Sequence, residues 1–295
     1  MLDIVIVNYK AKFFLTKCLN SLVPALKNLD YILYIVENGS GDNLKDLQKI
    51  IPFNLIDSKT NLGFAKANNI ALKKCKSKYI LLLNPDTIVT EDCIKGMLTY
   101  MQDNNEVGLS TCYLQLKKTK KLDPASHRGF PTAWNSFTYY SGLSKLFPKS
   151  KVFSGYQMTY KDIKKVHSID SPSGAFFLTT KKVLDKVGIL DEQFFMYAED
   201  IDLAKRIKNA DYKVMFNPNY RAYHYKGISS GIKKDTQKSS KSTSKEKAKM
   251  TTSFYDTMAL FYKKHYDKEN NKLLNFLVYK AINFKKQIAL KKLTV

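Results

Sequence analysis

The chain has 295 residues, of which 44% are hydrophobic and 13% aromatic, so it can bury a full core as one large domain with or without an appendage. Its net charge of +23 at pH 7 attracts polyanions such as nucleic acid, anionic lipid or phosphorylated substrates. No helix-turn-helix, RNP or zinc-finger pattern accompanies that charge, and no run approaches the roughly 18 apolar residues of a membrane-spanning helix, so we expect neither a nucleic-acid partner nor a membrane span.

The first part of the chain alternates short apolar runs with helical patterns. Predicted strands cover Leu2–Val7, Tyr31–Val36, Phe53–Asp57, Tyr79–Leu83 and Val107–Leu116. Predicted helices cover Phe13–Leu26, Leu44–Ile51, Asn61–Cys75 and Thr90–Gln102. Such alternation predicts an α/β fold with a doubly wound, mostly parallel sheet flanked by helices.

Polar residues follow the predicted strands at their carboxyl ends. They are Asn8, Glu37, Asn38, Asn61 and Asp86. Any one of them could be an ordinary loop residue. Because the carboxyl ends of parallel strands share one rim, where open α/β sheets bind ligands, the set together predicts a nucleotide site.

The buried strand Tyr79–Leu83 ends in Asn84-Pro85-Asp86-Thr87, and Pro85 terminates it because proline cannot donate to a strand ladder. The carboxylate of Asp86 could hold a hard divalent cation that grips a diphosphate. The same four residues are also good turn formers, and Thr90 could cap the next helix. Both interpretations fit this stretch taken alone.

The middle of the chain is less regular. The expected features are a loop over the rim within Lys117–Lys165, two strands around a tight turn in Val166–Leu178, a helix over Thr180–Val187 and a strand over Tyr212–Phe216. Gly174 and Ala175 lie in the tight turn, where small residues let backbone approach a ligand closely.

Three acids, Glu199, Asp200 and Asp202, begin the next predicted helix. The helix dipole would explain their position without any catalytic role, because acids are stabilised at a helix N-terminus. Alternatively, one carboxylate faces a cleft and takes a proton from an attacking hydroxyl. A lone histidine such as His224 is more often structural than a ligand.

The C-terminal part is basic. Lys233–Lys249 has almost no apolar residue and is expected to be mobile, while Phe254–Tyr266 and Leu273–Leu290 return to helical periodicity. The last helix is amphipathic and rich in lysine, so it could lie on an anionic membrane or pack on the preceding domain.

Four scattered cysteines, Cys18, Cys75, Cys93 and Cys112, show no metal-binding spacing. We interpret them as buried free thiols in a reducing compartment. The N-terminus has no signal-peptide anatomy. These features predict a cytoplasmic protein, and the basic C-terminal part favours a peripheral position at the inner face of the cell membrane.

Several motifs occur in a characteristic order: Val5–Tyr9, Val36–Ser40, Asn61–Asn69, Leu81–Asp86, Gly174-Ala175, Leu190–Leu203, and His224 with Gly227 and Ser229. Together they resemble the family 2 glycosyltransferases of GT-A fold, in particular the rhamnosyltransferase-like branch, over roughly residues 1–230. The resemblance implies a nucleotide-sugar half (1–116) and an acceptor half (117–230) of one domain. Composition and periodicity add a flexible basic loop (231–250) and C-terminal amphipathic helices (251–295).

The resemblance also implies a reaction: inverting transfer of a sugar from a nucleotide-diphosphate donor, of the dTDP-rhamnose or UDP-sugar type, to a hydroxyl of a glycan or lipid-linked acceptor in cell-surface polysaccharide or glycolipid synthesis. The implied donor-binding residues are Asn8, Tyr9, Glu37, Asn38, Asn61, Gly63, Phe64, Asn68, Asn84, Asp86 and Gly174. Asp86 with His224 would bind Mg²⁺ or Mn²⁺. Asp200 would be the general base, with Glu199 orienting the acceptor.

Two residues depart from the family pattern. Asn84 stands where the metal motif usually has an acid, which should weaken metal binding in the absence of donor. Glu37 stands where aspartate is usual, which could shift base recognition. A catalytically weak lipid- or polyanion-binding scaffold on the same fold is the alternative hypothesis. The oligomeric state is not predictable from these features.

Overall fold

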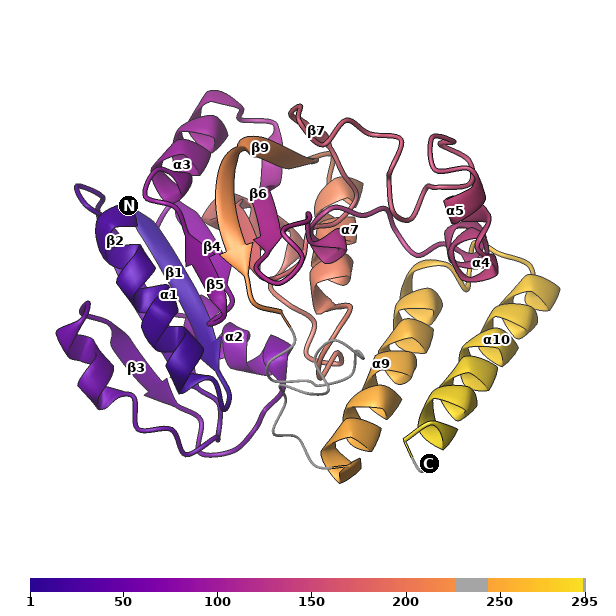
Figure 1. Ribbon diagram of the computed structural model, residues 1–295, viewed down its shortest axis with the longest axis horizontal. Coiled ribbons are helices and arrows are strands. Elements are labelled where there is room, and N and C mark those ends of the chain that lie inside the picture. The colour runs from indigo at the N-terminus through magenta and orange to yellow at the C-terminus, as the bar shows by residue number, and fades with distance from the viewer. Residues whose placement is uncertain (227–243, 294–295) are drawn as a thin grey trace.

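One sheet runs through the computed structural model, which describes residues 1–226 and 244–293 (Figure 1). Its strands are β1 Leu2–Asn8, β2 Tyr31–Glu37, β3 Asn54–Asp57, β4 Tyr79–Leu83, β5 Thr87–Val89, β6 Val107–Leu116, β7 His167–Ser168, β8 Phe176–Thr180 and β9 Lys213–His224. Across the sheet their order is β3-β2-β1-β4-β8-β6-β9-β5, with β7 paired to β9. The first four are mutually parallel, which confirms the predicted α/β fold class.

The other half of the sheet is mixed, because β8 runs antiparallel between β4 and β6. β8 therefore lies between β4 and β6 in the sheet, although it follows both of them in the chain. Leu83, the last residue of β4, pairs with Phe176, the first of β8. This register brings the Gly174-Ala175 turn to the carboxyl end of β4, beside Asn84.

The helices are α1 Lys12–Ala25, η1 Lys45–Lys49, α2 Phe64–Leu72, α3 Cys93–Asp103, η2 Pro124–Ser126, α4 Ala133–Ser141, α5 Leu143–Leu146, α6 Lys181–Val187, α7 Glu199–Asn209, α9 Ser244–His265 and α10 Lys272–Lys291. The predicted helix over Leu44–Ile51 is the short 3₁₀ turn η1. The predicted rim loop within Lys117–Lys165 contains α4 and α5, and α4 begins where the Thr132 hydroxyl accepts from Asn135 N. The short strand β5 was not predicted.

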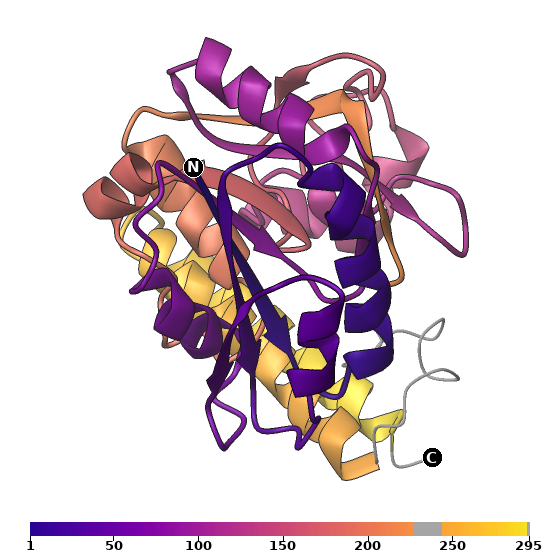
Figure 2. The same cartoon turned by 90° about the vertical axis from the view of Figure 1, so that its left-hand side faces the viewer.

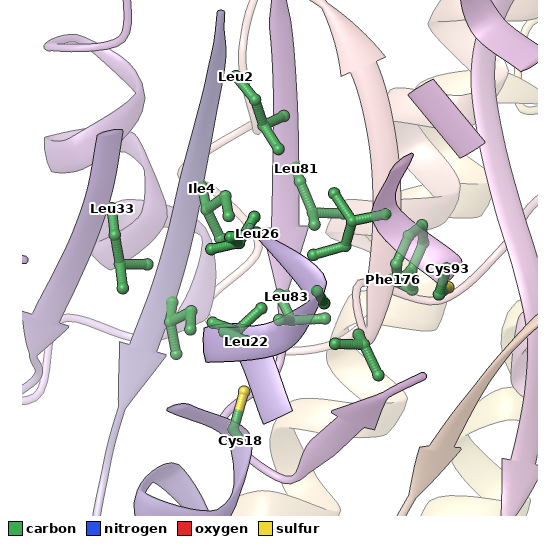
Figure 3. Packing of buried hydrophobic residues seen from close by; sticks show 14 of the residues in the cluster. Leu2, Ile4, Cys18, Leu22, Leu26, Leu33, Leu81, Leu83, Cys93 and Phe176 are labelled. Atoms are coloured by element: carbon green, nitrogen blue, oxygen red, sulfur yellow. The ribbon is translucent and has the colours of Figure 1, made fainter. Parts of the chain in front are cut away.

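Burial on both faces explains the composition of β4. Tyr79, Leu81 and Leu83 face one apolar cluster, while Ile80 and Leu82 face the other. Helix α1 covers the first face and α2 the second, as Figure 2 shows from the side of these helices. Figure 3 shows Leu22 of α1, and Leu26 directly after that helix, among the side chains packed with Leu81 and Leu83. The four cysteines are buried and free, as predicted.

The C-terminal helices form an antiparallel pair beside the sheet domain (Figure 1). Helix α9 begins at Ser244 rather than Phe254, and the added turns pack on the protein, because Met250 and Thr251 within them are buried. Later in the helix, Phe261 and Tyr262 pack with Phe194 and Ile201. The predicted loop 231–250 otherwise lies outside the described residues, as do Gly227 and Ser229. Within the two described ranges, no helix is long and apolar enough to cross a membrane.

Candidate active site

Parallel register aligns polar residues at one rim of the sheet. Asn8 pairs with Glu37, and Glu37 with Asp57, so the ends of β1, β2 and β3 are level. Beyond them lies a cavity of about 520 Å³. It is lined by Glu37, the loop Gly39–Lys45, Leu55, Asp57 and Lys59. The predicted nucleotide rim therefore opens onto a real hollow of the molecule.

Several predicted donor-binding side chains build this rim from within. Glu37 accepts from Gly39 N at 3.0 Å and from Ser40 N at 2.8 Å, so its carboxylate closes its own loop. The side-chain oxygen of Asn38 accepts from Leu62 N at 3.0 Å, and its amide nitrogen donates to Asn61 Oδ1 at 3.3 Å. These bonds hold the loops after β2 and β3 together around the hollow.

Asn8 differs from these residues. Its amide nitrogen donates to Asp42 at 2.9 Å, whereas its buried Oδ1 has no hydrogen-bond partner among the described residues. Buried polar atoms are normally satisfied, so an orphaned acceptor at the rim points to a donor group supplied by a ligand.

The start of α2 lies against the segment before α7. Gly63 has φ +82°, and a Cβ there would lie 2.3 Å from Phe195 O, so only glycine fits. Phe64 N donates to that same carbonyl at 2.7 Å, and the Phe64 ring lies against Gly174. Asn68, by contrast, is almost fully buried and donates to Phe64 O within its own helix. The Asn68 side chain thus bonds to the backbone of its own helix and does not line the cavity.

The candidate metal residues lie at the carboxyl ends of two strands, Asp86 just after β4 and His224 as the last residue of β9. Asp86 Oδ1 lies 3.2 Å from His224 Nε2, and both side chains are buried. On its other side His224 Nδ1 lies 2.8 Å from Asp123 Oδ2, a carboxylate contacted also by Lys226. Burial by itself would lower the pKa of His224, but the charges of Asp86 and Asp123 outweigh it and raise that pKa to about 9.

This donor set fits a divalent cation. Carboxylate and neutral imidazole both bind such ions, so the proton that Asp86 favours on His224 would have to leave when a cation binds. A histidine ligand is commonly oriented by a carboxylate on its other nitrogen, as His224 is by Asp123 here. The buried Oδ1 of Asn84 has no partner in the part of the chain that the structure describes, so it too is available as a ligand. Among the residues that the structure describes, no three His, Cys, Asp or Glu side chains converge on one metal position. The diphosphate and water would have to complete the shell.

The acids at the start of α7 form a second buried cluster. Asp200 Oδ2 accepts from Arg128 Nη2 at 2.8 Å and from Gly174 N at 3.3 Å. Beside it, burial and the charge of Asp200 raise the pKa of Glu199 to about 8, and Glu199 Oε2 has no partner among the described residues. The two neighbours therefore differ: at neutral pH Glu199 holds a proton, while Asp200 is paired with a guanidinium.

One turn connects the two clusters. Gly174 N donates to Asp200, and the next residue, Ala175, accepts from Asn84 N at 3.3 Å and from Thr87 Oγ1 at 3.2 Å. Asn84 and Thr87 flank Asp86 closely in the chain. The antiparallel insertion of β8 thus brings the candidate metal residues and the candidate base to the two sides of a single short segment.

Two residues of this site were not predicted, Arg128 and Asp123. Each lies in the irregular stretch after β6, far in sequence from its partner in the cluster. A signal for Arg128 existed, because this lysine-rich chain has only three arginines, at positions 128, 206 and 221. Arginine in place of lysine is favoured where a planar guanidinium must pair with a buried carboxylate.

A family model described as glycosyl transferase family 2 matches residues 3–187. Rhamnosyltransferase WbbL of Escherichia coli K12 is 31% identical over 174 residues, which is 55% of this chain and 61% of WbbL. Poly-beta-1,6-N-acetyl-D-glucosamine synthase of Staphylococcus epidermidis is 23% identical over 67% of this chain and 43% of the synthase. The chain thus spans about two fifths to three fifths of these relatives' lengths.

Solved structures share the fold. The mannosyltransferase PcManGT of Pyrobaculum calidifontis, in complex with GDP-Man and Mn²⁺, aligns with a TM-score of 0.58 at 12% identity, covering 99% of this chain and 72% of that one. TarS of S. aureus aligns with a TM-score of 0.53 at 12% identity, over 88% of this chain and 43% of TarS. At such identities the likeness concerns the fold alone.

Proposed function

This chain belongs to glycosyltransferase family 2, and on that premise we propose that it is an inverting, metal-dependent enzyme that moves a sugar from a nucleotide-diphosphate donor to a hydroxyl of a glycan or lipid-linked acceptor. The observation that carries the proposal is the Gly174-Ala175 turn, which holds the Asp86 cluster on one side and Asp200 on the other. Donor and acceptor groups would meet between these clusters.

The nucleotide half of the donor would occupy the rim cavity. Its lining combines carboxylates, Lys45 and Lys59, and the unpartnered Asn8 Oδ1 lies at the same rim. In this proposal the nucleotide is surrounded by residues at the ends of the first strands and at the start of α2, namely Tyr9, Glu37, Asn38, Asn61, Gly63 and Phe64. The names of the relatives suggest rhamnosyl or N-acetylglucosaminyl donors, of the dTDP- or UDP-linked type.

Asp86, His224 and the Asn84 amide oxygen would hold Mg²⁺ or Mn²⁺, which when bound offsets charge on the diphosphate leaving group. Asp123 keeps the His224 ring oriented. Two neighbours of similar fold carry Mn²⁺, PcManGT and GalNAc-T7, which supports a divalent ion in this chain.

Asp200 would accept the proton of the acceptor hydroxyl as that oxygen attacks the sugar. Arg128 and Gly174 N hold Asp200 Oδ2 in place, and Ile201 N donates to Oδ1 at 2.8 Å. The remaining lone pair of Oδ1 would take the incoming proton. Glu199 is a poorer base at neutral pH, because its raised pKa keeps it protonated. It would instead donate a hydrogen bond that positions the acceptor.

We further propose that the protein works in the cytoplasm at the inner face of the cell membrane.

The proposal is tested with Asp200→Asn. We expect sugar transfer to fall by about 10²–10⁴-fold while donor binding with Mn²⁺, measured by calorimetry, stays near the wild-type value. Asp86→Ala should show the opposite pattern, a loss of Mn²⁺-dependent donor binding. Asp185→Asn, at an exposed acid of α6, is the matched control and should change neither quantity.

Because Asp200 is the partner of the buried Arg128, thermal unfolding must first confirm that Asp200→Asn is folded at the assay temperature. Wild-type turnover by a folded Asp200→Asn protein would refute the assignment of the base. If the protein hydrolysed no nucleotide sugar in the presence of Mn²⁺, the proposed metal-dependent transfer would be refuted and the scaffold alternative favoured.

A further inference from the structure

Helix α10 exposes an apolar stripe on its outer side. Five side chains form it and are each between 39% and 70% exposed: Leu273, Phe276, Leu277, Phe284 and Ile288. At 3.6 residues per turn these positions share one side of the helix. The opposite side is already occupied, because Val278 and Tyr279 pack on the α9 cluster and Asn275 accepts from Tyr262 at 2.8 Å.

The stripe corrects the simple amphipathic picture of this helix. Sequence periodicity groups Leu274, Leu277 and Val278 on a single apolar side. In the structure Leu274 and Val278 are partly covered, as is Ile282 one turn further on, whereas Leu277 is 54% exposed. The helix therefore has a narrow inner apolar face for α9 and a second outer one that the described chain leaves uncovered.

Charge decides what kind of partner fits this outer face. Helix α10 carries five lysines, Lys272, Lys280, Lys285, Lys286 and Lys291, and no acid. A second copy of the chain would bring two such lysine-rich helices together, and each molecule has a net charge of +23. An anionic lipid surface attracts this charge and accepts large apolar side chains at its headgroup boundary.

From these observations we propose that the outer face of α10 lies in the plane of an anionic membrane surface, with Leu273, Phe276, Leu277, Phe284 and Ile288 inserted among the headgroups. Its inner face stays on α9. This inference deepens the proposed function, since it states which surface of the enzyme meets the lipid.

The contacts of α9 couple that surface to the candidate acceptor side. Lys264 and His265 of α9 bind Asp202 of α7, at 2.7 and 2.8 Å, and α7 also carries Asp200. The Phe254 ring of α9 meets the Tyr197 ring edge-on at 5.5 Å, two residues before Glu199. A membrane bound at α10 would thus hold the candidate base in one orientation toward the lipid, as a lipid-linked acceptor requires.

Vesicle sedimentation of the full chain tests the inference. Wild-type protein should sediment with phosphatidylglycerol/phosphatidylcholine vesicles, more weakly with pure phosphatidylcholine, and less as salt rises. The double variant Phe276→Ser, Phe284→Ser should partition at least about tenfold more weakly. Phe13→Ser is the matched control, because Phe13 is 65% exposed and Phe284 is 67% exposed, yet Phe13 belongs to α1. It should bind like wild type.

Equal vesicle binding by the double variant and wild type would overturn the inference, as would equal loss in the Phe13→Ser control. The inference would also be overturned if the wild-type protein did not bind vesicles but formed a dimer in analytical ultracentrifugation, and the double variant stayed monomeric. The assay needs neither donor nor turnover, so its failure is distinct from failure of the catalytic proposal.

Discussion

Asp202 of α7, the helix of the candidate base, forms ion pairs with the C-terminal helix α9. From these contacts we predict how much its replacement lowers the free energy of unfolding. The carboxylate is completely buried. It accepts from Arg206 Nε at 2.8 Å on its own helix, and from Lys264 and His265 of α9. Burial alone would raise the pKa of Asp202, but the hydrogen bond to His265 and the charges of Arg206 and Lys264 lower it to about 2.

A carboxyl pKa lowered from 3.8 to about 2 corresponds to about 2 kcal/mol of stability at pH 7, at about 1.4 kcal/mol per unit. The unfolded chain binds the proton more readily, so this stability is complete above pH 4 and is lost as the pH falls toward 2. We therefore expect Asp202→Asn to lower the free energy of unfolding by about 2 kcal/mol at pH 7.

Urea unfolding at pH 7, together with hydrogen exchange of α9 amides, measures this effect. The control is Asp185→Asn, which breaks an exposed ion pair with Lys181 and should cost less than about 0.5 kcal/mol. The reasoning fails if both variants are equally stable and the amides of α9 are as protected in Asp202→Asn as in the wild type.

Three further predictions concern individual groups. The pKa of Glu199 is raised in the folded protein, so its contribution to stability is present below pH 4.5 and is lost as the pH rises toward 8. Because glutamine does not titrate, the melting temperature of Glu199→Gln should rise progressively above that of wild type from pH 5 to 8. Burial lowers the pKa of His127 to about 4, so the contribution of this histidine to the free energy of unfolding should fall by about 3 kcal/mol between pH 6.5 and 4. In urea titrations the difference in stability between wild type and His127→Gln should therefore shift by that amount in favour of the variant over this range. Gly63→Ala, which meets Phe195 O, should destabilise by about 2 kcal/mol or more in thermal melts, whereas Gly41→Ala, also at positive φ but in open space, should cost only about 1 kcal/mol.

Local patterns predicted much of the first half of the fold. The apolar run Tyr79–Leu83 predicted a strand buried on both faces, and β4 has all five residues buried. The same alternation predicted the parallel β1–β4 region and the position of the polar rim. This succeeds because a parallel strand covered by helices must be continuously apolar, and because its carboxyl end must then carry the first polar residues.

Other features depended on contacts that no local pattern records. Asp200 meets Arg128 from 72 positions away, and His224 meets Asp123 from 101 positions away. The roles of Asp86, Asp200 and the other site residues stay predictions, but their grouping into two clusters comes from the insertion of β8. Periodicity likewise could not tell which apolar side of α10 faces α9.

The sequence by itself determined the family, the fold class and the short motifs, because each of these is written in residues close together in the chain. Tertiary structure alone decided how the Gly174-Ala175 turn joins two clusters and which phenylalanines of α10 stay exposed. The physical reason is that the pairing of a buried charge and the covering of an apolar face depend on which distant segment folds against them.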